Sequence, residues 1–363
     1  MSRPHWLVLE PYYGGSHRHL VDGLAERLEG ARLSLWTLPP RKWKWRMRGA
    51  ALQLARRWWR EREELGDVAG IFTSSLLDAA ALRGLLPPEA RTLPLVLYCH
   101  ENQLTYPVRV DDRRDYNYAW TNIQSLLAAD RVLWNSAYNR DSLLAELPGY
   151  LKRMPDERPR GLEAVIRERS RVLPVPLDVR ALEAAAADAP ARRGPCRILW
   201  NHRWEHDKDP ESFFAALERL ADEGLAFDVA VLGESFERRP EVFGRARERL
   251  ADRIAVWGYR ESREEYVAEL ARADVAVSTA RHEFQGLAIL EAAACGAVPL
   301  VPDRLAYREI WPEDLRYPNG GLVRALRERV RDVESWRRRD VRTICRSFDW
   351  EALLSAWEAA FVE

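Results

Sequence analysis

Short apolar runs alternate with longer segments of mixed apolar and charged residues along most of the chain. The short runs have the length of buried strands, and the longer segments have the apolar spacing of helices that cover a sheet. This alternation predicts an α/β fold with parallel strands. We predict strands at residues 6–10, 32–38, 70–73, 95–99, 131–135 and 171–174, and again at residues 197–201, 226–232, 254–257, 275–278 and 298–301.

The strand pattern stops and then restarts, which predicts two domains. The restart follows residues 178–195 (DVRALEAAAADAPARRGP), which are rich in Ala, Pro and Arg and which we interpret as the linker region. Helices are predicted at residues 17–29 and 50–65, among others. Two doubly wound units in succession make a cleft between them, and such sheets bind ligands at the carboxyl ends of their strands.

Four polar segments directly follow predicted strands, where that rule places a ligand: PYYGGSH (11–17), HENQLTYP (100–107), NHRWEHDK (201–208) and RHEFQG (281–286). In the first of them, Gly14 and Gly15 allow backbone N–H groups to approach a donor substrate closely. The segment matches neither the GxGxxG nor the Walker pattern. An ordinary tight turn explains it nearly as well.

The third segment carries Arg203 and Lys208, five residues apart on one predicted loop. Two such cations can clamp a diphosphate, the arginine by a fork of donors and the lysine as a compact charge. Lys208 is also one of only four lysines among the 56 basic residues of the chain. The alternative is a solvated surface loop.

The fourth segment leads into an apolar stretch, LAILEAAACG, that is predicted to be a helix opened by Gly286 and Leu287. The free N–H groups and the positive end of a helix dipole suit a donor phosphate. Glu283 precedes the helix and can accept hydrogen bonds from sugar hydroxyls, while Glu291 lies eight residues later and can reach a ribose diol. The alternative for Glu291 is a place on the exposed stripe of the helix.

The charge and composition limit the possible partners. The 56 basic and 56 acidic residues among 363 cancel, so any contact with nucleic acid must be local. The first apolar run is too short for a signal peptide, and no run reaches the ~18 residues needed to cross a bilayer. The four cysteines lack CxxC spacing and are interpreted as reduced thiols. We expect a cytoplasmic protein.

Residues 41–50 (RKWKWRMRGA) concentrate five cations and two tryptophans in this electrically balanced chain. Cations neutralise phosphates, and indoles stack on unpaired bases. The alternative is an Arg-rich amphipathic helix whose tryptophans reach the core, and for Trp58 and Trp59 both interpretations stay open. We favour acceptor contacts, predicted at Arg41, Lys42, Trp43, Lys44, Trp45 and Arg46, with Asn102 from a separate loop.

His100 ends a predicted strand beside polar neighbours and joins Arg203, Lys208 and Glu283 as a catalytic candidate. The metal-binding patterns HExxH and paired cysteines are missing from the sequence. The pair at residues 111–112 (Asp-Asp) lies in a charged stretch, and we interpret it as solvated rather than as a magnesium site. The sequence therefore predicts no metal.

Taken together, these residues resemble the GT-B glycosyltransferases, specifically the retaining family 4 group. VLPVPLDV (172–179) is similar to the interdomain segment of that group, and SFDWEALLSAWEAAF (347–361) to its closing helix. The resemblance implies two Rossmann-like domains facing a central cleft. It implies an acceptor-side domain at 1–175, a nucleotide-sugar-binding domain at 176–340 and a C-terminal segment at 341–363 that packs back on the first domain.

A narrower resemblance is carried by LEPYYGGSH, TLPPRKWKWRMRGAA, YCHENQLTYP, NIQSLLAAD and NHRWEHDKDP, which look like the tRNA-queuosine α-mannosyltransferase family. That family implies a retaining transfer of mannose from GDP-mannose to the cyclopentenediol of queuosine in the anticodon loop of tRNA(Asp). It implies no metal, no membrane and no obligate protein partner. Two alternatives stay open: a GT-B enzyme with a lipid or polysaccharide acceptor, and a non-catalytic RNA-binding protein.

Overall fold

The computed structural model describes residues 3–107, 115–190, 192–235 and 240–362, so the pair at 111–112 lies outside the described residues. The chain divides into two compact units. The first unit comprises Met1–Pro176 with Leu353–Glu363, and the second comprises Leu177–Ala352. The predicted first boundary, at residues 175 and 176, lies within one residue of this division.

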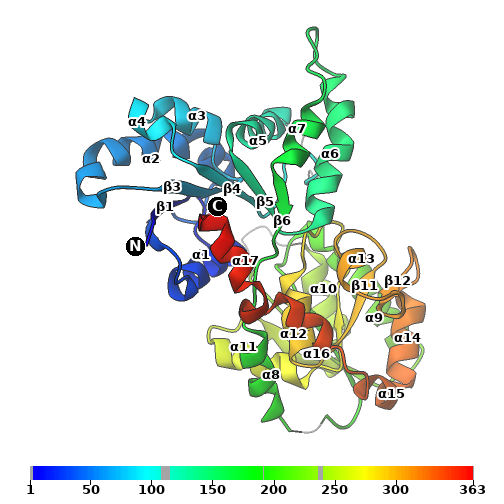
Figure 1. Cartoon of the computed structure of the whole chain (residues 1–363). Helices are drawn as coiled ribbons and strands as arrows, with labels where there is room; N and C mark the ends of the chain where they lie inside the picture. Colours follow the sequence, from blue (N-terminus) through cyan, green and yellow to red (C-terminus); the bar gives the residue numbers. More distant parts are fainter. Residues whose placement is uncertain (1–2, 108–114, 191, 236–239, 363) are drawn as a thin grey trace. The chain divides into compact units, whose positions relative to one another are not determined.

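In the first unit, the described residues form a parallel sheet of six strands in the order β2-β1-β3-β4-β5-β6 (Figure 1). Its elements are β1 (His5–Glu10), α1 (Gly15–Arg27), β2 (Arg32–Thr37), α2 (Trp43–Leu65), β3 (Gly70–Ser74), α3 (Ala79–Leu85), α4 (Pro88–Arg91), β4 (Leu95–Cys99), α5 (Tyr116–Ala128), β5 (Arg131–Trp134), α6 (Ala137–Leu151), α7 (Leu162–Glu168), β6 (Ser170–Val172) and most of α17 (Trp350–Val362).

Helices cover both faces of this sheet. On one face, α2, α3 and α5 bury a core that includes Leu7 and Leu97, whose side chains point to the same side of their strands. On the other face, Phe361 of α17 makes an edge-to-face contact with Trp6, with ring centroids 5.3 Å apart. Trp357 of the same helix packs on Phe72. Strands buried on both faces explain why the sequence shows apolar runs rather than strict alternation.

The second unit repeats the plan, with a described parallel sheet in the order β12-β11-β10-β7-β8-β9. Helices α8, α11, α12 and α16 cover one face, and α9, α10 and α14 cover the other (Figure 1). Its elements are α8 (Val179–Ala187), β7 (Cys196–Asn201), α9 (Pro210–Asp222), β8 (Phe227–Leu232), α10 (Val242–Arg249), β9 (Ile254–Gly258), α11 (Arg263–Arg272), β10 (Val275–Val277), α12 (Leu287–Ala294), β11 (Val298–Pro302), α13 (Tyr307–Ile310), β12 (Arg316–Tyr317), α14 (Leu322–Arg331), α15 (Val333–Arg337) and α16 (Arg342–Cys345).

Helix α2 begins seven residues earlier than the sequence predicts, at Trp43 instead of residue 50. The buried series Met47, Ala50, Ala51 and Leu54 has helical spacing and extends into the cationic segment. The cations at 44 and 48 then lie on the exposed side. The segment is therefore the first two turns of an amphipathic helix.

The prediction of a linker at residues 178–195 is wrong for most of that segment. Most of it is helix α8, whose Val179, Leu182 and Ala186 are buried in the core of the second unit. Alanine is the strongest helix former, so an Ala-rich segment with apolar residues at this spacing favours a helix over an open connection.

The C-terminal segment 341–363 is divided between the two units. Residues through Ala352 group with the second unit, where Val341 and Cys345 are buried, and Leu353 onward groups with the first. The two-residue edge strand β12 was not predicted, because such a short strand carries no periodic signal.

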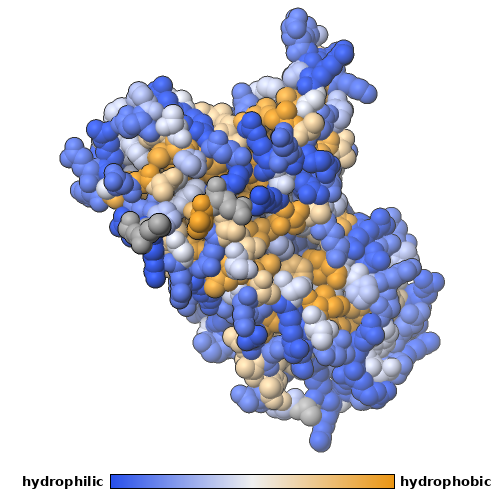
Figure 2. Space-filling view, viewed as in Figure 1, coloured by the Kyte–Doolittle hydropathy of each residue, from blue (hydrophilic) through white to orange (hydrophobic). Residues whose placement is uncertain are grey.

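Hydrophilic side chains predominate over the outer surface of both units on the face seen in Figure 2, with hydrophobic ones in separate patches. All four cysteines are buried free thiols. No helix in the described part of the chain has the length and apolar character to cross a membrane.

Candidate active site

The strand order of the second sheet reverses between β7 and β10, so a ligand site is expected at the carboxyl ends of these two strands. The loop after β7 contains a short 3-10 turn, His206–Lys208, and the loop after β10 contains Glu283. The two predicted catalytic groups meet there. Lys208 Nζ lies 3.1 Å from Glu283 Oε2.

Glu283 holds the loop before α12 with its second oxygen. Its Oε1 accepts hydrogen bonds from the backbone N–H groups of Phe284, Gln285 and Gly286, at 3.1, 3.3 and 3.0 Å. Burial alone would raise the pKa of Glu283, but Lys208, with smaller contributions from His202 and the backbone N–H of Gln285, outweighs it and lowers the pKa to about 2. The carboxylate is therefore ionised throughout the neutral range.

Lys208 is a nearly buried cation, with 10% of its side chain exposed. Besides Glu283, it donates to the backbone carbonyl of His282 at 3.1 Å and lies 3.4 Å from Asp207 Oδ2. Burial opposes ionisation of Asp207, yet Lys208 and Arg203 still lower its pKa. A buried ammonium among two carboxylates is a preformed charged site rather than a solvated loop.

Arg203 and His202 border this cluster. Arg203 is half exposed and forms an ion pair with Glu205 at 3.2 Å. Burial, with a contribution from Lys208, lowers the pKa of His202 to about 4, so its ring is neutral at neutral pH. Among the described residues, its buried Nε2 has no hydrogen-bond partner.

A pocket of about 290 Å³ lies at Glu291, on α12. The carboxylate of Glu291 is 15% exposed and bonds Arg263 at 2.6 Å and the hydroxyl of Tyr266 at 3.0 Å. Tyr259, which is 62% exposed, and Arg260 line the same pocket. Glu291 thus faces a polar pocket instead of lying on a solvated helix stripe.

The start of α12 is shaped by Gly286, which has a φ of +81°. A Cβ at this position would lie 2.8 Å from the ring of Tyr307, so both the conformation and the space require glycine. Leu287 is the first helical residue, and the first-turn N–H groups are those that an anion would meet.

The first sheet also reverses its strand order, between β1 and β3, and a second charged cluster lies at that edge. His17 of α1 lies between Glu10, at the end of β1, and Glu101, after β4. Its Nδ1 is 3.2 Å from Glu10 Oε1, and its Nε2 is 3.6 Å from Glu101 Oε2. The ring also stacks on His100, with ring centroids 3.9 Å apart.

The two stacked histidines differ in charge. Burial alone would lower the pKa of His17, but the carboxylates of Glu10 and Glu101 outweigh it and raise the pKa to about 10. Burial, with the neighbouring His17, lowers the pKa of His100 well below its usual range. At neutral pH the charged ring of His17 therefore stacks on the neutral ring of His100. The buried Nδ1 of His100 has no hydrogen-bond partner among the described residues.

The raised pKa of His17 predicts a pH-dependent stability. This contribution is complete below pH 6.5 and is lost as the pH rises towards 10, because the unfolded ring releases its proton first. Relative to a His17→Gln variant, the wild type should lose up to about 1.4 kcal/mol of unfolding free energy per pH unit in that window. Urea unfolding at a series of pH values measures this. Parallel curves for wild type and His17→Gln would contradict the prediction.

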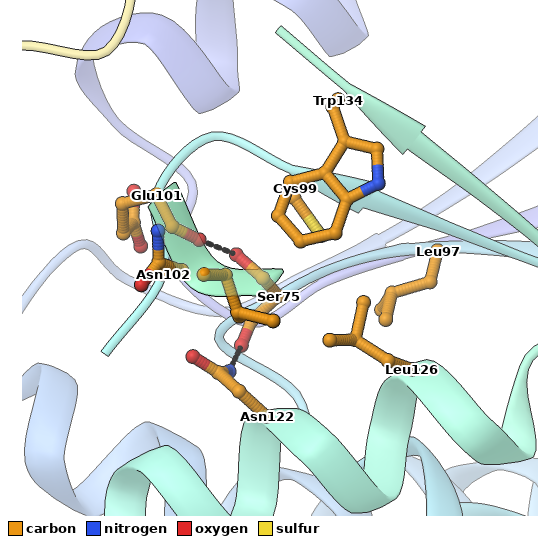
Figure 3. A pocket seen from close by; sticks show the side chains of 9 residues that line it. Ser75, Leu97, Cys99, Glu101, Asn102, Asn122, Leu126 and Trp134 are labelled. Atoms are coloured by element: carbon orange, nitrogen blue, oxygen red, sulfur yellow. Dashed lines mark hydrogen bonds between the residues drawn. The ribbon is translucent and has the colours of Figure 1, made fainter. Parts of the chain in front are cut away.

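Figure 3 shows the packing beneath the loop after β4. The hydroxyl of Ser75 donates to the backbone carbonyl of Glu101, and Asn122 donates to the carbonyl of Ser75. The void that these side chains line has no space for a water-sized sphere. The void is therefore not a ligand pocket, and the side chains around it hold the backbone of Glu101 in place.

Asn102 has a structural role in the described contacts. It is 1% exposed, its amide donates to Asn139, and its carbonyl accepts from Thr105. The amide side chain holds the loop, so the predicted acceptor contact from this residue does not fit its position.

Gly14 and Gly15 lead into α1. A Cβ at Gly14 would lie 2.5 Å from Pro40, and Gly15 has a φ of +52°.

The structure separates the predicted acceptor residues into exposed and buried ones. Arg46 is only 8% exposed and donates to the carbonyl of Pro39 at 3.3 Å, so its prediction as an acceptor contact does not fit its burial. Trp43 packs on Tyr118, with ring centroids 5.2 Å apart. The exposed members are Arg41, Lys42, Lys44 and Trp45. Lys42 caps α2 with a φ of +56°.

Sequence reasoning missed several residues of these clusters. Glu10, His17 and Glu101 lie in segments that were singled out, but nothing in the local pattern showed that they meet. Arg263 and Tyr266 begin α11, far in sequence from Glu291. Ligands of doubly wound sheets bind where the strand order reverses, and this rule points to Glu10 and His17, because Glu10 ends β1 and His17 lies in the first turn of the following helix α1.

Family profiles match both parts of the chain. Residues 5–177 match the profile described as tRNA-queuosine alpha-mannosyltransferase N-terminal, and residues 195–332 match that of glycosyl transferases group 1. The tRNA-queuosine alpha-mannosyltransferase of Drosophila melanogaster is 38% identical over 322 residues, which cover 87% of this chain and 84% of that protein. The chain belongs to the tRNA-queuosine alpha-mannosyltransferase family.

More distant relatives of this family member share parts of its sequence or its fold. A GDP-mannose-dependent alpha-(1-6)-phosphatidylinositol dimannoside mannosyltransferase of Mycobacterium tuberculosis is 30% identical over 168 residues, 43% of this chain and 42% of that protein. Sucrose-phosphate synthase of Thermosynechococcus elongatus aligns with a TM-score of 0.72 at 18% identity, covering 99% and 98% of the two chains. A UDP-forming trehalose-phosphate synthase of Burkholderia xenovorans gives 0.68 at 15%, covering 100% and 98%.

These solved structures show the fold of this tRNA-queuosine alpha-mannosyltransferase family member. Its two parallel-sheet, Rossmann-like units are those of the GT-B glycosyltransferases, as predicted. In the described part of the chain, no three His, Cys, Asp or Glu side chains are placed to hold a metal ion.

Proposed function

We propose that this glycosyltransferase moves mannose from GDP-mannose to the cyclopentenediol of queuosine in the anticodon loop of tRNA(Asp), in the cytoplasm. Mannosyl transfer to queuosine in tRNA follows from the family, to which the match with the Drosophila enzyme over most of both chains assigns the protein. The residue chemistry described above supports a nucleoside-diphosphate donor, and the choice of tRNA(Asp) rests on the family resemblance of the sequence. A relative that is named as GDP-mannose-dependent supports the choice of donor.

The buried Lys208–Glu283 pair is the observation that carries the donor half of the proposal. We assign the donor diphosphate to Lys208, Arg203 and the N-terminal end of α12, whose charges stabilise the leaving phosphate as the sugar–oxygen bond breaks. Protein cations then supply the positive charge, and no metal ion is part of the proposal. Glu283 is assigned to the hydroxyls of the mannose.

The pocket at Glu291 is assigned to the nucleoside of the donor. Its carboxylate accepts hydrogen bonds from the ribose diol, and the exposed ring of Tyr259 offers a surface for the base. A volume of about 290 Å³ is close to the lower range of small-ligand sites.

His100 is assigned to the mannose from the first unit. A neutral imidazole can donate from one nitrogen and accept at the other, which suits a sugar hydroxyl. His17, held by Glu10 and Glu101, is assigned to the orientation of His100 through their stacked rings. For retention of configuration, we propose that the acceptor oxygen attacks on the face that the phosphate leaves, and that a phosphate oxygen takes its proton.

The function is tested by incubating the protein with queuosine-containing tRNA(Asp) and a panel of nucleotide sugars in the presence of EDTA. Nucleoside mass spectrometry should show a hexose increment on queuosine with GDP-mannose alone. Matched tRNA that carries guanosine at the same position should remain unmodified. Transfer from another nucleotide sugar, or to another nucleoside, would contradict the assignment, and loss of activity with EDTA would contradict the metal-free donor site.

Replacing Glu291 with glutamine should weaken nucleotide binding. The amide keeps the shape of the side chain but loses the charge that strengthens hydrogen bonds to a diol, so the Kd for GDP should rise roughly 10- to 100-fold. Calorimetry with GDP measures this. Glu264→Gln, an exposed neighbour on α11, is the control and should bind GDP as the wild type does. Equal affinity of the Glu291 variant would remove the ribose assignment.

A further inference from the structure

The outer face of α2 exposes three large side chains that a helix would ordinarily bury. Trp45, Leu52 and Trp59 are 56%, 52% and 55% exposed. They are spaced seven residues apart, which is close to two helical turns, so they form one stripe about 21 Å long. The opposite face of the helix is buried in the core of the first unit and already supplies its packing.

The indole of Trp45 is seated on a glycine. A Cβ at Gly49 would lie 2.8 Å from Cζ2 and 2.9 Å from Cε2 of Trp45, so the ring lies directly against the helix at that position. Glycine inside a helix is less favourable than alanine. Here it lets the ring lie flat and leaves more than half of Trp45 open to solvent.

The ring at the other end of the stripe is also held. Trp59 Nε1 donates a hydrogen bond to the backbone carbonyl of Leu85 at 3.2 Å, although the ring is exposed. Rings whose orientation is fixed lose little conformational entropy when a flat partner stacks on them.

Cations surround the stripe. Arg56 lies on the same side of the helix as Leu52 and Trp59, and Arg48 and Arg60 flank it. Arg48 pairs with Asp115, and Arg60 is 3.7 Å from Glu61. The sequence from 41 to 60 contains no acidic residue, so this face complements a polyanion.

We propose that the outer face of α2 is a binding surface for the acceptor RNA outside the modified nucleoside, with an unpaired base stacked on Trp45 and phosphates at Arg56 and Arg60. This inference rests on the proposed function and extends it beyond residues 41–46. Isolated flat rings between cations suit unpaired bases and phosphates. A membrane surface would instead require a continuous apolar face.

Gly49→Ala tests the proposal without weakening the helix. The added methyl displaces the exposed indole, while alanine favours the helical backbone. The Kd for queuosine-containing tRNA should rise roughly 3- to 10-fold, and that of Trp45→Ala roughly 5- to 100-fold. The matched control is Gly84→Ala in α3, where an added Cβ meets nothing within 4 Å. It should bind as the wild type does.

The phosphate contacts have their own signature. A double variant, Arg56→Gln with Arg60→Gln, should reduce the slope of log Kd against log salt by about 2. An unchanged slope together with unchanged affinity of the Gly49 and Trp45 variants would overturn the proposal.

Two further readouts separate this inference from the function itself. If wild-type protein mannosylates queuosine and all variants keep wild-type tRNA affinity, the inference is wrong and the function stands. If wild type transfers no mannose but Gly49→Ala still weakens tRNA binding, the surface stands and the function is wrong. If Gly49→Ala reduces retention on phosphatidylserine vesicles and leaves tRNA affinity unchanged, the face docks on membranes and the proposal is overturned.

Discussion

Replacing Lys208 with methionine is expected to lower kcat/KM for mannosyl transfer by about 10²- to 10³-fold. Methionine keeps the apolar stem and removes the ammonium that we assign to the leaving diphosphate. The expected loss is that of removing one preorganised donor from a developing negative charge. Steady-state transfer to queuosine-containing tRNA, followed by hexose incorporation, measures it.

The same substitution should destabilise the second unit, because Glu283 and Asp207 both lose their cation while they stay largely buried. Removal of one partner of a buried ion pair costs about 3 kcal/mol. Activity must therefore be compared at a temperature where both proteins are folded, as shown by circular dichroism. Lys152→Met, at the exposed end of α6, controls for the loss of a lysine. Undiminished transfer by folded Lys208→Met would remove Lys208 from the mechanism.

The predictable part of the fold is the part that periodicity controls. Each strand from β1 to β11 lies within two residues of a predicted run at both ends. The central strands are buried on both faces and are therefore apolar throughout, which makes them easy to recognise. The edge strand β12 has two residues and no such signal. The linker prediction is wrong over helix α8. Segment 178–195 as a whole is rich in Ala, Pro and Arg, as linkers are, but its prolines lie beyond α8, and the spacing of Val179, Leu182 and Ala186 is that of a helix.

The predictable part of the candidate site is the part that lies directly after strands. Lys208 and Glu283 were placed together by the rule for carboxyl ends, and the structure brings them within 3.1 Å. The partners of Glu291 could not be found in this way. Arg263 and Tyr266 reach it from the start of α11, a contact that depends on how two helices pack. The prediction of Arg46 as an acceptor contact failed for a different reason. A charged residue in a basic run can still be buried on the inner side of a helix.

Replacing Glu283 with glutamine is expected to lower kcat/KM by about 10²-fold while it preserves the loop before α12. The amide oxygen of the variant can still accept from the N–H groups of Phe284, Gln285 and Gly286. Its NH₂ group would then face Lys208, and two donors cannot bond each other. The ammonium loses one of its two carboxylate partners and keeps Asp207, and the mannose loses a charged acceptor. Wild-type kcat/KM in the folded variant would remove Glu283 from substrate recognition.

Combining the two substitutions separates structural from chemical roles of the pair. Methionine opposite glutamine leaves no buried carboxylate at position 283, so the double variant should be more stable than Lys208→Met alone, with a coupling free energy of about 1–3 kcal/mol. Urea unfolding of all four proteins gives this value. Activity should not recover with stability, because neither the cation for the phosphate nor the carboxylate for the sugar is restored. If transfer rises in parallel with stability, the pair serves the fold alone, and the leaving group must be stabilised by other residues.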